Sequence, residues 1–249
     1  NAMAHKIEKL KEKIKSGTVV TGVSVSCQAD FSYLKDLQKS NKYDFVAVDN
    51  QHSPLSEELL ANFSSMANSI GMPVMLRIKH RNDAFLIGHY LDLGPSLIEI
   101  PQVESVNDVI EARDNFYYPQ IGIRSWGGSF RPCIGDYPDR IEYSNWWNKH
   151  GILCTQLESI NAVSNARNYG LNGADIVSWG PNDLAFNLEG NPFSPLKTDD
   201  DCVAYVLDQL GGMDTKLCMR TYGEEDVSKY LKAGVTVFLD ESKLYMEPS

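Results

Sequence analysis

Short apolar runs alternate with helix-like segments along most of the chain, and this alternation restricts the possible folds more than any other feature. The runs are rich in Val, Ile and Leu and end at Gly, Pro, Asn or Asp, as strands buried on both faces of a parallel sheet do. We count eight, at residues 18–25, 45–48, 73–78, 97–100, 152–157, 176–178, 216–219 and 236–239. Eight alternating units in 249 residues predict an α/β protein with a (β/α)8 TIM barrel.

Helical periodicity fills the intervals between these runs. The expected helices are residues 5–16, 31–39, 56–70, 82–93, 106–115, 159–169 and 224–233, and none is expected after the last strand. Residues 117–150 break the rhythm and are expected to form a functional loop or lid. We predict one domain over residues 4–249, and we leave out of the fold argument residues 1–3, which we interpret as a remnant of an expression tag.

Charge and composition exclude several classes of protein. The formal net charge of −10 argues against a general nucleic-acid-binding protein, which needs a basic excess to neutralise phosphates. No apolar run approaches the ~20 residues of a membrane-spanning helix, so no membrane association is expected. The five cysteines are scattered and odd in number, which fits reduced thiols and a cytoplasmic location.

Polar side chains follow several of the predicted strands where each strand ends. They are Asp49, His52, Arg77, Gln156, Glu158 and Asp183. Because the carboxyl ends of barrel strands meet at one mouth, where active sites lie, we expect these groups to face a common site. Glu158 and Asp183 would repel each other without a cation, so they predict an oxygen-rich site for Mg²⁺ or Mn²⁺. The alternative is that Glu158 caps the following helix and Asp183 caps its own turn.

The basic side chains of this set suit a reaction that passes through an oxyanion. The fork of donors on Arg77 can hold a developing enolate or carboxylate, and His52 can transfer a proton near neutral pH. Asp92, on the helix after the third strand, could orient His52 or raise its basicity. The alternatives are that Asp49 caps the next helix, that His52 is an ordinary loop residue, and that Asp92 is a surface carboxylate, which its spacing alone favours.

Five short motifs together resemble the HpcH/HpaI aldolase family, the metal-dependent class II pyruvate aldolases of the phosphoenolpyruvate/pyruvate barrel superfamily. The motifs are Asp-Asn-Gln-His-Ser-Pro at 49–54, Leu-Arg at 76–77, Gly-Ile-Arg-Ser-Trp-Gly-Gly at 122–128, Gln-Leu-Glu at 156–158 and Gly-Pro-Asn-Asp-Leu at 180–184. They appear in the family's order and near its spacing, from about residue 16 to residue 245. The combination is therefore specific, although each motif alone is weak.

The resemblance implies a role for each matching side chain. The implied assignments are His52 as general base, Arg77 as the enolate-stabilising group, Asp92 as the carboxylate that raises the basicity of His52, Glu158 and Asp183 as metal ligands, Gln156 as a substrate contact, and Asn182 and Asp183 as backbone donors to the pyruvate carboxylate. Three departures from the family stand out. They are Asn50-Gln51 in place of Gly-Glu before the histidine, Ser125-Trp126 after Arg124, which puts a bulky ring near the mouth, and the absence of most of the family's C-terminal helix.

We therefore expect an enzyme that reversibly cleaves a 4-hydroxy-2-oxo acid to pyruvate and an aldehyde. The expected cofactor is a divalent ion, Mg²⁺, Mn²⁺ or Co²⁺, on Glu158 and Asp183, since no lysine at the predicted strand ends could form a Schiff base. The expected partners are these small molecules and further copies of the chain in a homo-oligomer. Two alternatives stay open, namely citrate-synthase-like or acyl-CoA lyase chemistry on the same barrel, and a barrel that binds without catalysis.

Overall fold

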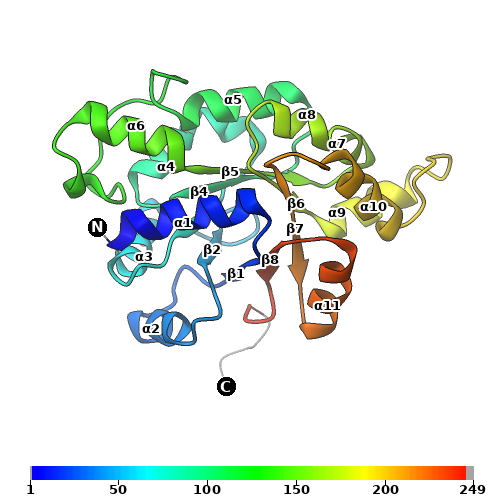
Figure 1. Ribbon diagram of the computed structural model, residues 1–249, viewed down its shortest axis with the longest axis horizontal. Helices are drawn as coiled ribbons and strands as arrows, with labels where there is room; N and C mark the ends of the chain where they lie inside the picture. The colour runs from blue at the N-terminus through cyan, green and yellow to red at the C-terminus, as the bar shows by residue number, and fades with distance from the viewer. Residues whose placement is uncertain (1, 245–249) are drawn as a thin grey trace.

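The structure is a computed structural model that describes residues 2–244, and it contains a closed barrel of eight parallel strands (Figure 1). Each strand pairs with the next along the chain, and β8 returns to β1 with Val237 opposite Val20. The strands are β1 Val20–Ser24, β2 Phe45–Asp49, β3 Val74–Arg77, β4 Leu97–Ile100, β5 Ile152–Leu157, β6 Ile176–Trp179, β7 Lys216–Thr221 and β8 Val237–Asp240. The predicted (β/α)8 barrel is confirmed.

Helices connect consecutive strands and surround the barrel (Figure 1). The α-helices are α1 Ala2–Ser16, α2 Phe31–Lys39, α3 Glu57–Ser69, α4 Ile87–Asp92, α5 Val106–Phe116, α6 Arg140–His150, α7 Ile160–Ser164, α8 Ala166–Leu171, α9 Pro181–Glu189, α10 Asp199–Gln209 and α11 Glu224–Ala233, and the 3₁₀ helices are η1 Arg81–Leu86 and η2 Ile134–Asp136. Two expected helices are divided, one into η1 and α4 and the other into α7 and α8. The sequence does not predict α9 and α10. Residues 2 and 3 belong to α1, and Met3 is buried there.

Two apolar layers hold the barrel together. One layer lies between the strands and the helices, and the other fills the barrel interior. Leu10 and Ile14 of α1 belong to the interior layer, so this helix covers the end of the barrel where the strands begin. Gly22 gives space to the interior Phe45, because a Cβ on this glycine would lie 2.2 Å from the phenyl ring. No helix in residues 2–244 is long and apolar enough to cross a membrane.

Residues 117–150 do not form a lid over the barrel mouth. Their last part is α6, which contacts α1 through a hydrogen bond from Trp146 Nε1 to Glu8 Oε1 (3.0 Å). Trp147 is fully buried and donates from Nε1 to the Phe116 carbonyl at 2.8 Å. None of these residues lines the cavity at the mouth. The lid interpretation is wrong because buried aromatic rings fix the segment against the outer helices.

Candidate active site

A cavity of about 450 Å³ opens at the carboxyl ends of the strands, where the fold predicts a site. The site residues predicted from the sequence that line it are Asp49, His52, Arg77, Gln156, Glu158, Asn182 and Asp183. They come from the ends of β2, β3 and β5 and from the first turn of α9. The closed barrel thus brings together residues that lie more than one hundred positions apart in the sequence.

Asp49 organises the β2 side of this cavity. Its Oδ1 accepts a hydrogen bond from Arg77 Nε at 2.7 Å, and its two oxygens also accept from the backbone N–H groups of Gln51 (2.9 Å) and His52 (3.0 Å). Burial disfavours the charged carboxylate, but Arg77 and the two N–H groups outweigh it and lower the pKa of Asp49. Asp49 therefore holds both the guanidinium and the turn that carries His52. It does not cap α3, because Ser56 does.

Arg77 presents its guanidinium to the cavity in a fixed orientation. Asp49 holds Nε, and Nη1 donates to Gln156 Oε1 at 3.4 Å. Burial opposes the positive charge, but Asp49 and Glu99 outweigh it and raise the pKa of Arg77. No group in the described part of the chain accepts a hydrogen bond from Nη2. This nitrogen can therefore donate to an anionic ligand.

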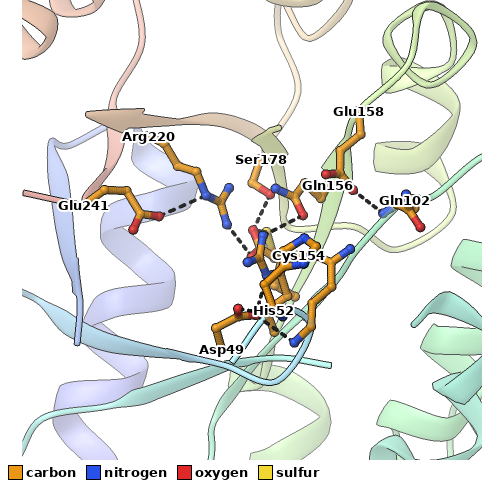
Figure 2. A network of polar contacts seen from close by, with 12 residues as sticks. Asp49, His52, Gln102, Cys154, Gln156, Glu158, Ser178, Arg220 and Glu241 are labelled. Atoms are coloured by element: carbon orange, nitrogen blue, oxygen red, sulfur yellow. Dashed lines mark hydrogen bonds and ion pairs between the residues drawn. The ribbon is translucent and has the colours of Figure 1, made fainter. Parts of the chain in front are cut away.

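Glu158 and Asp183 form a close pair of carboxylates in the same cavity. Burial and the Asp183 charge raise the pKa of Glu158 to about 7, although the Gln102 backbone N–H donates to Glu158 Oε2 at 2.6 Å and lowers it (Figure 2). Gly180 gives Glu158 its space, because a Cβ there would lie 2.2 Å from Glu158 Cγ. The alternative role of Glu158 as a helix cap is wrong, since Ser159 caps α7.

A divalent cation fits this pair of carboxylates. Burial and, to a smaller extent, the Asp183 charge raise the pKa of Glu158, and a hard cation between the two carboxylates would relieve their repulsion. Within residues 2–244, no group of three or more His, Cys, Asp or Glu side chains could hold a metal ion. The chain would therefore supply Glu158 and Asp183, while water or substrate would supply the remaining oxygen ligands, an arrangement common for Mg²⁺.

A buried ion-pair network borders the site between β4, β7 and β8 (Figure 2). Glu99 is fully buried and accepts hydrogen bonds from Arg220 Nη2 at 2.6 Å and from Ser178 Oγ. Arg220 also donates from Nε to Glu241 Oε1 at 3.1 Å and from Nη1 to the Trp179 carbonyl at 2.9 Å. Burial disfavours both charges, but their mutual attraction outweighs it, so the pKa of Glu99 is lowered and that of Arg220 is raised.

The network of Glu99, Arg220 and Glu241 is the part of the site that the sequence does not predict. Glu99 interrupts an otherwise apolar strand, and a carboxylate in a fully buried strand is unusual enough to be a signal. Its register partner in β3 is Arg77, so the two side chains project from the sheet at the same level. Arg220 and Glu241 carry a weaker signal, since each only follows an apolar run.

Asp92 lies outside the cavity, at the end of α4. Its Oδ1 accepts a hydrogen bond from Arg124 Nη2 at 2.8 Å, and the Arg124 guanidinium lies 4.5 Å from the centroid of the Tyr118 ring. The structure therefore does not bring Asp92 to His52 within one chain. Trp126 does not reach the mouth either, because it packs on the Tyr118 ring with the centroids 5.6 Å apart. The expectation of a bulky ring near the mouth is wrong.

The fold and the site define a (β/α)8 barrel whose mouth combines paired carboxylates with an oriented arginine. Residues 30–194 match the family model described as HpcH/HpaI aldolase/citrate lyase. The chain belongs to this family and is thereby an enzyme of the lyase class.

Two curated relatives and one solved structure agree with this family. The chain is 26% identical to hydroxypyruvate/pyruvate aldolase of Pseudomonas aeruginosa, over 76% of this chain and 70% of the relative. It is 28% identical to 2-keto-3-deoxy-L-rhamnonate aldolase of Shigella boydii, over 72% of this chain and 66% of the relative. An HpcH/HpaI aldolase from Desulfitobacterium hafniense DCB-2 has the same fold, with a TM-score of 0.81 at 23% identity over 93% of this chain and 89% of that chain.

Proposed function

We propose that the protein is a metal-dependent aldolase that reversibly cleaves a 4-hydroxy-2-oxo acid to pyruvate and an aldehyde. The observation that carries this proposal is that one cavity holds an arginine oriented by Asp49 and, beside it, the carboxylate pair Glu158 and Asp183. The names of the curated relatives support the same class of reaction. No residue that lines the cavity in the described chain is a lysine, which favours enolate chemistry over a Schiff base.

The residues of the cavity have different roles in this proposed reaction. A divalent cation on Glu158 and Asp183 would supply Lewis-acid stabilisation of the negative charge on the 2-oxo acid. Arg77 Nη2 donates to the oxygen that becomes the enolate oxygen, and the fixed guanidinium needs no reorganisation when that charge develops. His52 accepts the proton of the 4-hydroxyl group, directly or through one water, as the C3–C4 bond breaks. The bonding electrons pass to the pyruvate enolate, and protonation at C3 then gives pyruvate.

Solvent exchange of the pyruvate methyl protons tests the proposal without knowledge of the aldehyde. Pyruvate in deuterium oxide with the enzyme and Mn²⁺, Mg²⁺ or Co²⁺ should lose its methyl proton signal, because the same enolate forms in the reverse direction. Exchange no faster than with an Arg77→Ala variant, under every metal, would favour a barrel without catalysis.

Cation binding provides a second test that does not depend on turnover. Calorimetric titration with Mn²⁺ should show binding to the wild type and none to Glu158→Ala or Asp183→Ala, because each change removes one of two protein carboxylates. Exhaustive chelation should abolish exchange, and added Mn²⁺ should restore it. Full exchange after chelation contradicts the metal mechanism. Homo-oligomer formation and the cytoplasmic location stay predictions from the sequence.

A further inference from the structure

The cavity carries more acidic than basic side chains. Its charged lining consists of the carboxylates Asp49, Glu99, Glu158, Asp183 and Glu241 and the arginines Arg77 and Arg220. His52 is the remaining titratable base of the lining. One divalent cation and the carboxylate of one pyruvate unit leave the balance negative, even with His52 protonated. A second carboxylate on the substrate would therefore enter a site that already has excess negative charge.

The arginines of the cavity have little capacity to neutralise such a second carboxylate. Every nitrogen of Arg220 already donates to a protein oxygen, on Glu241, Trp179 or Glu99, and the residue is only 9% exposed. Arg77 has one nitrogen without a described protein acceptor, and the pyruvate unit needs it. The half of the substrate beyond the pyruvate unit thus has no free guanidinium among the described cavity residues.

The order of the strands indicates which side of the cavity lies opposite the proposed site of the pyruvate unit. In the closed barrel β1 lies four strands from β5 in both directions, so the end of β1 lies across the mouth from Glu158. The wall at β8 and β1 contains Ser24, Ser26 and Glu241, and Ser24 hydrogen-bonds to the Glu241 carboxylate. A substrate whose oxo acid end contacts Arg77 and Glu158 and which crosses the mouth from there would reach this wall. The serine hydroxyl groups there can donate hydrogen bonds to substrate hydroxyl groups or accept hydrogen bonds from them, and the carboxylate can accept them.

We propose that the aldehyde half of the substrate is an uncharged hydroxyaldehyde, and that aldehydes carrying a carboxylate are selected against by Glu241. This inference rests on the proposed function and specifies its substrate class. It also separates the aldolase from citrate-synthase-like chemistry, because the electrophile of that reaction carries carboxylates that would meet the same acidic wall.

Paired aldehydes of similar size test this selection. Aldol addition of pyruvate is measured with glycolaldehyde against glyoxylate, and with glyceraldehyde against tartronate semialdehyde. Within each pair the main change is a hydroxymethyl group replaced by a carboxylate. We expect kcat/KM to favour the neutral member by at least about tenfold, as repulsion between like charges in a partly buried site predicts.

A matched pair of variants tests whether the charge of Glu241 causes the preference for neutral aldehydes. Glu241→Gln keeps the shape of the side chain and removes its charge, so the ratio of kcat/KM values should shift towards the anionic aldehyde by about tenfold. Glu225→Gln makes the same chemical change on an exposed position of α11, outside the cavity, and should leave the ratio unchanged. If Glu241→Gln does not fold, the wild-type ratios of kcat/KM for the two aldehyde pairs still test whether anionic aldehydes are selected against.

The outcomes separate this inference from the proposed function. Pyruvate methyl exchange in the wild type, together with equal or greater use of the anionic aldehydes, would overturn the inference and leave the aldolase proposal standing. An unchanged ratio in a folded Glu241→Gln variant that still exchanges pyruvate protons would overturn the role of Glu241. No exchange with any metal would overturn the proposed function and the inference with it.

Discussion

The substitution Gly180→Ala tests the cation site through a single methyl group. The backbone of Gly180 has φ −111° and ψ 83°, which an alanine can adopt. The new Cβ would lie 2.2 Å from Glu158 Cγ and 2.9 Å from Glu158 Oε1. Since carbon atoms pack at about 3.5 Å, the Glu158 side chain must move by roughly 1 Å. A displacement of this size at a catalytic site costs about one hundredfold in rate, and overpacking costs about 1–3 kcal/mol in stability.

We expect Gly180→Ala to weaken Mn²⁺ binding at least about tenfold and to slow pyruvate exchange by about one hundredfold. Calorimetry measures the first quantity, proton NMR the second, and urea unfolding confirms that the variant is folded. The control is Gly127→Ala, because a Cβ at Gly127 meets no atom within 4 Å in the described structure. A folded Gly180→Ala variant with wild-type Mn²⁺ affinity and exchange rate would refute the assignment of Glu158 as a cation ligand.

Three further predictions concern the charged groups around this site. Arg77→Lys should lower the exchange rate by on the order of one hundredfold, because a point charge cannot reproduce a fork that Asp49 orients, and a loss confined to pyruvate affinity would contradict this role. The folded-state pKa of Asp49 is lowered, so its contribution to stability is present above the unfolded-state pKa and is lost as pH falls through the folded-state value. Between about pH 6 and pH 3, urea unfolding should therefore show the wild type losing about 1 kcal/mol more than Asp49→Asn, and equal losses would argue against the ion pair. Glu99→Leu should destabilise the fold by about 3 kcal/mol, because it leaves Arg220 buried with only one carboxylate, and an unchanged urea midpoint would contradict this.

Local features of the sequence are sufficient to predict the barrel and many of the residues of the site. Strand and helix periods, and the Gly, Pro and Asn residues that end each run, depend on near neighbours, so they can be read without the fold. The position of His52, Arg77 and Glu158 at or shortly after the ends of apolar runs places them at the mouth once the strands are parallel. The segment 117–150 is the clear failure, because its order comes from aromatic contacts with distant helices and not from a local period.

Closure of the barrel determines which distant charged side chains become partners, and no local sequence pattern contains this information. Glu99, Arg220 and Glu241 lie far apart in the sequence and become an ion-pair network only because β4, β7 and β8 all contribute to one mouth. The same closure leaves Asp92 on the outside with Arg124, away from His52. Charge type and strand position are properties of the sequence, but the pairing of each charge depends on strand register and on which side chains burial brings into contact. For this protein the sequence is enough to place His52, Arg77 and Glu158 at the mouth, and the tertiary structure determines which further charged groups join them and which groups remain available to a ligand.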